Sequence, residues 1–279
     1  MGEEVQKSEH RLKIYEKIKQ YEKEERWDED VEDDPPTIPL LPNKVDYLNK
    51  KLLNKICTKI GNTLAVKYFE GLIKKRQFII KNIVGIENYR AVKGGAILTC
   101  NHFNPFDNYA VNRAIRDDLG KRRLYKVIRE GNFTNFPGFV GFLFRHCNTL
   151  PLSSNTDTMK KFLSAMHILL VRGEKILIYP EQAMWWNYRK PRPLKDGAFN
   201  FAVSNNVPVI PVFITMEDSD VLDAEGFYVQ EYTIHFLPAI YPDKNLNKKQ
   251  NIQMMKEKNY NGWKEVYEKF YNIPLDYKN

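Results

Sequence analysis

A histidine and an aspartate five residues apart, His102 and Asp107, form the most informative local feature of the sequence. The apolar run Ala96–Cys100 predicts a strand, and Asn104-Pro105 predicts a helix start, because Asn is a preferred N-cap and Pro suits the first helical position. The imidazole and the carboxylate are therefore expected together at the C-terminal end of a strand, where open α/β sheets bind ligands. There His102 would accept a proton from a hydroxyl, while Asp107 would fix its tautomer and stabilise the imidazolium.

Two other interpretations of this segment stay open. Asn104 and Asp107 resemble a capping box, in which the carboxylate reaches back to the N-cap amide and does not meet His102. Cys100 lies two residues before His102, on the same side of the predicted strand, and is a conceivable nucleophile. A Ser-His-Asp hydrolase of the α/β type is excluded, because the sequence has no Gly-x-Ser-x-Gly elbow.

Short β-rich runs alternate with helical stretches from about residue 78 onward. The predicted strands are Phe78–Val84, Ala96–Cys100, Tyr125–Ile128, Asn148–Leu152, Lys175–Tyr179, Val209–Ile214 and Thr233–Leu237. Helices are expected near 105–118, 156–171, 196–205 and 248–271. This alternation predicts an α/β fold, with a largely parallel or mixed central sheet sandwiched by helices.

The first 77 residues differ in composition from the rest and predict two further segments. Residues 6–26 predict a polar helix whose narrow apolar stripe docks on the main domain, an N-terminal helical appendage. The acidic run Asp28–Asp34, followed by Pro35-Pro36, is typical of a solvated linker. We therefore expect a charged helix and linker over 1–36, a basic amphipathic segment over 37–77 and the α/β domain over 78–279.

Residues 46–75 carry apolar side chains at helical spacing and many lysines, opposed by Asp46 and Glu70. The whole chain has a formal net charge of +8, which predicts an anionic partner. A basic amphipathic helix is typical of segments that lie on an anionic membrane surface, and no zinc finger, RNP motif or Walker loop points to nucleic acid. An ordinary surface helix with its apolar side on the core is the alternative, and Gly61 is a point where the helix could divide in two.

The sequence contains no apolar stretch of the roughly 18 residues that a transmembrane helix requires. Its first residues predict neither a secretory signal nor myristoylation, so we expect a peripheral protein on the cytoplasmic face of the cell membrane. The three cysteines, Cys57, Cys100 and Cys147, are widely spaced and form no Cys-x-x-Cys pair. They predict reduced thiols and no metal site.

The segment around His102 resembles the first signature of the glycerolipid acyltransferase family, which contains the 1-acylglycerol-3-phosphate acyltransferases: Asn-His, four residues, then Asp. Three further blocks follow in the family's order. Phe136–Leu152 resembles the second block, and Ile176–Glu181 resembles the strand that carries the Pro-Glu-Gly-Thr-Arg block. Gly197–Val203 with Val207–Val212 resembles the fourth, so the resemblance covers about residues 90 to 216.

This resemblance implies a transfer of a fatty acyl group from an acyl thioester, acyl-CoA or acyl carrier protein, to a hydroxyl of a lipid acceptor. His102 would be the base, Asp107 would orient it, and Glu181 would help to hold the acceptor. The apolar fourth block would shape the surroundings of the acyl chain. The family's reaction implies no metal and no bound cofactor, since the thioester is a co-substrate.

The sequence departs from the family where the acceptor's phosphate is expected. Gln182-Ala183-Met184 and then Trp185-Trp186 stand in place of Gly-Thr-Arg, and Ser153-Ser154 stand where an arginine is usual. Met and Ser cannot replace the bidentate phosphate contacts of arginine. The substrate-binding residues that we expect instead are Gln182, Arg189, Arg192 and Lys195, with Lys190 among them.

Three alternatives to a phosphate-binding loop remain. In the first, the acceptor lacks a phosphate, and Trp185 and Trp186 face a sugar, another lipid head group or the bilayer interface. In the second, the two rings only anchor their loop at the membrane. A non-catalytic peripheral lipid-binding relative is the alternative from a different functional class.

Overall fold

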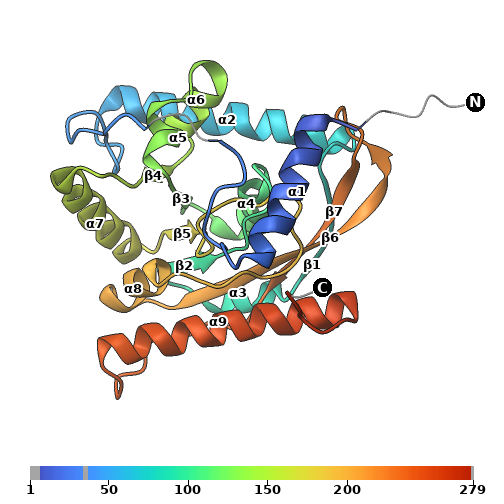
Figure 1. Ribbon diagram of the computed structural model, residues 1–279. Coiled ribbons are helices and arrows are strands. Elements are labelled where there is room, and N and C mark those ends of the chain that lie inside the picture. The colour runs from blue at the N-terminus through green and yellow to red at the C-terminus, as the bar shows by residue number, and fades with distance from the viewer. Residues whose placement is uncertain (1–6, 34–36, 278–279) are drawn as a thin grey trace, which may run out of the picture.

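The fold is a mixed α/β sandwich built on one central sheet (Figure 1). The computed structural model describes residues 7–33 and 37–277, and within these the sheet has seven strands in the order β1-β7-β6-β2-β5-β3-β4. The strands are β1 (Ile79–Val84), β2 (Ala96–Thr99), β3 (Leu124–Ile128), β4 (Thr149–Pro151), β5 (Lys175–Ile178), β6 (Val209–Leu222) and β7 (Tyr228–Phe236). The predicted α/β class with a largely parallel or mixed sheet is confirmed.

Helices cover both faces of this sheet. They are α1 (Glu9–Lys23), α2 (Leu52–Lys74), α3 (Ile86–Ala91), α4 (Asp107–Leu119), α5 (Glu130–Thr134), α6 (Gly138–His146), α7 (Thr156–Val171), α8 (Gly197–Ser204) and α9 (Lys248–Tyr271). Across residues 7–33 and 37–277, none of the helices combines the length and the apolar composition that crossing a bilayer requires. The first residue of the predicted helix 6–26 and the Asp34-Pro35-Pro36 part of the predicted linker lie outside the described residues, as do the N-terminal residues 1–6.

The direction of the strands explains where a ligand site can form. β6, β2, β5, β3 and β4 are parallel to one another, whereas β7 is antiparallel to β6 and β1 is parallel to β7. The C-terminal ends of β2, β5 and β3 therefore lie side by side at one edge of the sheet. Residues that follow these three strands are brought together although they are far apart in the sequence.

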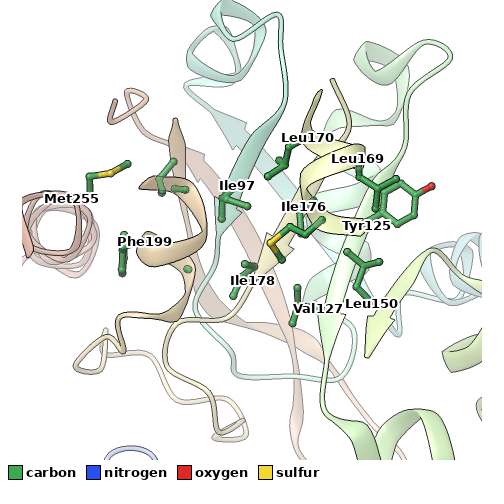
Figure 2. Close-up of a cluster of buried hydrophobic side chains, with 14 of the residues drawn as sticks. Ile97, Tyr125, Val127, Leu150, Leu169, Leu170, Ile176, Ile178, Phe199 and Met255 are labelled. Carbon is green, nitrogen blue, oxygen red and sulfur yellow. The ribbon is translucent and has the colours of Figure 1, made fainter. Parts of the chain in front are cut away.

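Alternation along the central strands divides the core into two layers. Ile97 of β2 and Ile176 and Ile178 of β5 pack on α7, α8 and α9, as Figure 2 shows for this cluster. Leu98 and Leu177, one residue along in each strand, point to the other face and pack with α3, α4 and the end of α2. Burial of each such side chain contributes about 1.5–3 kcal/mol to folding. Both faces are apolar, which is why these strands appear in the sequence as continuous apolar runs.

The predicted docking of the N-terminal helix is observed. Ile14, Ile18 and Tyr21 of α1 are buried in a third cluster, which lies over the loop that follows β5 and includes Phe227, the residue before β7. The Ser8 side chain caps the helix by accepting a hydrogen bond from the Arg11 N–H. Of the predicted stripe of Leu12, Tyr15, Ile18 and Tyr21, the last three therefore pack on the main domain, whereas Leu12 is 43% exposed and Ile14 is buried in its place.

The basic segment folds differently from the prediction in two details. α2 begins at Leu52, not at 46, because the residues before it turn around Asp46, whose carboxylate accepts hydrogen bonds from the Lys50 and Lys51 amides. Gly61 does not divide the helix. It is buried where α2 crosses α6, and a Cβ added there would lie 3.1 Å from the His146 Cβ, so the glycine permits a close helix contact.

Some elements were not predicted from the sequence. β6 continues to Leu222 and pairs with a longer β7, because cross-strand hydrogen bonds support polar residues that have little strand propensity of their own. α6 has the nearly continuous apolar sequence Gly-Phe-Val-Gly-Phe-Leu-Phe and therefore shows no polar–apolar helical period. α3 and α5 are too short to give a periodic signal.

Candidate active site

The candidate active site lies at the C-terminal ends of β2 and β5. Thr99 of β2 pairs with Ile178 of β5, so His102 and Glu181 each come three residues after a paired position. The chain thus delivers an imidazole and a carboxylate to the same edge of the sheet. This is the location at which parallel sheets place their ligands.

His102 and Asp107 form the predicted pair. The His102 Nδ1 and the Asp107 Oδ2 are 2.7 Å apart, the carboxylate is fully buried, and the imidazole remains 22% exposed. Within the part of the chain that the structure describes, no protein group hydrogen-bonds to the His102 Nε2. Nδ1–H donating to the carboxylate leaves the Nε2 lone pair available to accept a proton from a substrate hydroxyl.

The two interpretations of Asp107 turn out to be compatible. Its Oδ2 also accepts hydrogen bonds from the Phe103 and Asn104 amides, at 3.3 and 3.4 Å, as a capping carboxylate would. The helix starts later than expected, at Asp107 itself, because the Asn104 side chain accepts from the Phe106 amide and holds the preceding residues in a turn. One oxygen therefore caps the turn and orients the imidazole.

A tyrosine that the sequence interpretation missed completes the pair. The Tyr179 hydroxyl donates to the Asp107 Oδ1 at 2.5 Å, and its ring stacks on the His102 imidazole with centroids 4.0 Å apart and planes at 16°. Burial and the neighbouring Asp107 charge raise the pKa of the Tyr179 hydroxyl well above its ordinary value, so it stays a neutral donor. Its position directly before Pro180-Glu181 was the signal that could have identified it.

Glu181 and Arg192 form a buried ion pair that holds the backbone of His102. The Glu181 Oε2 accepts from the His102 N–H at 3.0 Å and from the Arg192 Nη2 at 3.0 Å, and the same Nη2 donates to the His102 carbonyl at 3.3 Å. Both side chains are at most 2% exposed. The structure thus places Glu181 and Arg192 behind His102, in contact with its peptide groups.

The other basic residues of the loop pair with carboxylates of other segments. Lys195 lies 2.8 Å from the Asp28 carboxylate, Arg189 2.7 Å from Asp218, and Lys190 2.5 Å from Glu22. Gln182 is exposed and has a positive φ of 66° in the turn after Glu181. The structure therefore brings Arg192 and Glu181 to His102, but does not bring Arg189 or Lys190 into contact with it.

The alternative in which Trp185 and Trp186 face a head group or the bilayer is wrong. Trp185 is fully buried and Trp186 is 4% exposed, because α1 covers the loop and packs on both rings. Trp185 also stacks on Trp27, and its Nε1–H donates to the Glu29 carbonyl at 2.9 Å. The tryptophans form the interface between the N-terminal segment and the domain.

Three further side chains at this edge are already engaged. The Ser153 and Ser154 hydroxyls donate to the Glu130 carboxylate at 2.7 and 2.9 Å. Cys100 is fully buried, and burial raises the pKa of its thiol well above the ordinary value, which argues against a thiolate nucleophile. No group of three or more His, Cys, Asp and Glu side chains suited to a metal ion occurs in residues 7–33 and 37–277.

A cavity of about 100 Å³ lies away from this site, between α2, α6 and residues 44–49. His146 and Tyr125 line it, whereas His102 and Asp107 do not. It offers no base with a charged partner. The hydrogen-bonded dyad, partly open to solvent, is the better candidate for chemistry.

Comparison with known proteins gives one family model and one solved structure that are similar to this chain. Residues 81–215 match the protein-family model described as Acyltransferase. Among solved structures, the 1-acyl-sn-glycerophosphate (LPA) acyltransferase PlsC from Thermotoga maritima is similar, with 16% sequence identity, a TM-score of 0.47, and coverage of 77% of this chain and 97% of that chain. No curated protein sequence matches the chain. The matched segment, residues 81–215, contains His102, Asp107 and Glu181 and is similar to an acyltransferase domain.

Proposed function

We propose that this protein transfers a fatty acyl group from an acyl thioester, acyl-CoA or acyl carrier protein, to a hydroxyl of a lysophospholipid or related lipid. The observation that carries the proposal is the 2.7 Å contact between His102 Nδ1 and the buried Asp107, inside the segment that matches the family. The unpartnered Nε2 at the surface supports a role as general base. No bound cofactor is part of the proposal.

The proposed reaction is a direct transfer in a ternary complex. The His102 Nε2 takes the proton of the acceptor hydroxyl while its oxygen attacks the thioester carbonyl carbon. The carbon–sulfur bond then breaks, and the thiolate leaves with the proton that the imidazolium carries. Asp107 stabilises the imidazolium between these steps, and the N-terminus of α4 favours the negative charge of the intermediate. The buried, protonated Cys100 supports a path without an acyl-enzyme.

The acceptor is proposed to be bound at the outer side of the loop that follows β5. Lys195 is the basic residue that best fits an anionic head group, because its amide donates to the Pro180 carbonyl beside Glu181 and its side chain is half-exposed; it would exchange its Asp28 partner for the head group. Gln182 lies exposed beside Glu181 in the same loop. Arg189 would contribute only from further along the loop, by leaving Asp218. Arg192 and Glu181 would act through the His102 backbone.

An anionic membrane surface is the proposed location. α2 and α6 pack together and leave a row of large apolar side chains exposed: Leu52, Leu53, Ile56, Ile60, Leu64 and Tyr68 of α2, with Phe139 and Val140 of α6. Exposed lysines flank this row at Lys51, Lys55, Lys59 and Lys67, while Glu70 is paired with Arg113 and Arg116. Apolar side chains beside cations match an anionic interface.

Mass spectrometry of lipid products tests this function. The protein is incubated with acyl-CoA or acyl carrier protein and a mixture of lysophospholipids and glycolipids, in parallel with the His102→Ala variant and with sedimentation on anionic vesicles. We expect an acylated product that His102→Ala does not form, although the variant still binds vesicles. Vesicle binding without any product from the unmodified protein would favour a non-catalytic lipid-binding relative.

A further inference from the structure

We propose that Tyr179 is a positioning residue of this reaction, which fixes both the carboxylate and the imidazole of the Asp107–His102 pair. The inference rests on the proposed function, but the contacts themselves are independent of which acceptor is used. Tyr179 directly follows a different strand, β5, whereas His102 and Asp107 follow β2. It therefore connects the two halves of the sheet edge at the site.

The first argument is the number of hydrogen bonds that Asp107 accepts. Its Oδ2 is used by the His102 Nδ1 and two backbone amides, and its Oδ1 is used by the Tyr179 hydroxyl. Asp107 is fully buried, so water cannot replace a missing donor at Oδ1 without rearrangement. Without the tyrosine hydroxyl, Oδ1 would have no donor, and the carboxylate plane that aligns the imidazole would no longer be held from that side.

The second argument is the stacking of the rings. The Tyr179 and His102 rings are nearly parallel at a centroid separation of 4.0 Å, so the tyrosine covers one face of the imidazole. This contact limits rotation of the imidazole out of the plane of its hydrogen bond. The ring and the hydroxyl of one side chain thus restrain the two partners separately, which allows the two effects to be measured with different substitutions.

The third argument is electrostatic. A donor at Oδ1 draws negative charge away from Asp107 and so weakens its stabilisation of the imidazolium. Cys100 and Tyr232 also lie near Asp107, but burial raises the pKa of both groups, so they remain neutral and do not titrate with the dyad. The Glu181–Arg192 ion pair contacts the backbone of His102 and forms no hydrogen bond with the Tyr179 hydroxyl. Removal of the hydroxyl should therefore favour the protonated imidazole.

Two variants of the full-length protein separate these contributions. Tyr179→Phe keeps the stacked ring and removes only the hydroxyl, while Tyr179→Leu removes both. Tyr109→Phe is the matched control, because the Tyr109 hydroxyl also donates to a carboxylate, that of Glu70, at 3.2 Å and outside the dyad. Acyl transfer is measured with acyl-CoA and the acceptor found by mass spectrometry, and the Nδ1–H proton of the dyad is followed by low-field proton NMR.

We expect Tyr179→Phe to lower kcat about tenfold with little change in KM, as for loss of one hydrogen bond to a charged group. The acidic limb of its pH–rate profile should move to higher pH, and the low-field resonance should shift. Tyr179→Leu should lower kcat further, and Tyr109→Phe should change none of these quantities. A Tyr179→Phe protein with unchanged kcat, or with an unchanged acidic limb and resonance, would overturn the proposal. If the unmodified protein transferred no acyl group, the proposed function would fail, while the NMR comparison would still test Tyr179.

Discussion

Replacement of Arg192 by methionine separates two roles that this residue can have. If Arg192 binds the acceptor's phosphate, its loss should raise KM and leave the folded protein intact. The structure instead shows the guanidinium 1% exposed and in contact with the Glu181 carboxylate, the His102 carbonyl and the Ala183 carbonyl. Methionine is similar in length to the aliphatic stem of arginine and fills the apolar part of its space, so the variant removes mainly the guanidinium with its charge and its donors.

The expected loss of stability in Arg192→Met follows from the buried Glu181 charge, which is left without a partner. Glu181 would remain 2% exposed without its partner, and breaking a buried ion pair from one side costs about 3–5 kcal/mol. For a protein of this size each kcal/mol lowers the melting temperature by about 2–4 °C, so we expect a decrease of roughly 10 °C. Adding Glu181→Gln to Arg192→Met removes the unpaired charge and should recover part of the loss.

Arg189→Met is the matched control for this experiment. Arg189 also forms an ion pair with a carboxylate, but it is 40% exposed, and such surface pairs contribute only about 0–1 kcal/mol. Thermal unfolding of the four proteins, with kcat and KM for acyl transfer, gives the comparison. Wild-type stability of Arg192→Met together with a raised KM for an anionic acceptor would refute the structural role and restore phosphate binding by Arg192.

Three further predictions concern the surroundings of the site. Burial would raise the pKa of Glu130, but hydrogen bonds from the Leu40 amide and from Ser153 and Ser154 outweigh it and hold this pKa below its ordinary value. The Glu130 carboxylate therefore stabilises the fold at a pH above the pKa that it has in the unfolded chain. This contribution is lost as the pH falls through the lower pKa that it has in the folded protein. Chemical denaturation should therefore show Glu130→Gln destabilised at neutral pH, with the difference from wild type shrinking in acid; a difference independent of pH would contradict this. Trp185→Ala should lose about 3–5 kcal/mol in the free energy of unfolding while vesicle binding persists, because the ring is fully buried under α1; loss of vesicle binding at unchanged stability would mean that the ring is a membrane anchor. Ile56→Asp, on the exposed row of α2, should show the opposite pattern in sedimentation with anionic vesicles, with wild-type stability and weakened binding.

The sequence allowed the central fold and the dyad to be predicted because both depend on local patterns. The apolar runs that became β2 and β5 are buried on both faces, so they are recognisable without knowledge of their neighbours. His102 and Asp107 lie within one strand–turn–helix unit, and their contact needs only the short turn between them. The order of the family blocks along the sequence then identified the segment that contains the candidate active site.

The features that could not be predicted depend on contacts between distant segments. Burial of Trp185 requires α1, about 165 residues earlier in the chain, to pack on its loop, and no local pattern distinguishes that from exposure. The direction of the Arg192 side chain toward Glu181 depends on how the loop after β5 folds back. Tyr179 lies within the recognised block Ile176–Glu181, but its role depends on the pairing of β5 with β2.

The most direct test of the proposed roles of His102 as base and Asp107 as its partner is the rate of acyl transfer by two variants, His102→Ala and Asp107→Asn. Each variant is compared with the unmodified protein at the same folded concentration. Removal of a general base costs about 10²–10⁴ in rate, and an asparagine cannot both accept from Nδ1–H and stabilise an imidazolium. We predict that both variants fold, bind vesicles and lose acyl transfer by at least about a hundredfold. Transfer within tenfold of the unmodified rate in either variant would contradict the assignment of His102 as the base and Asp107 as its partner.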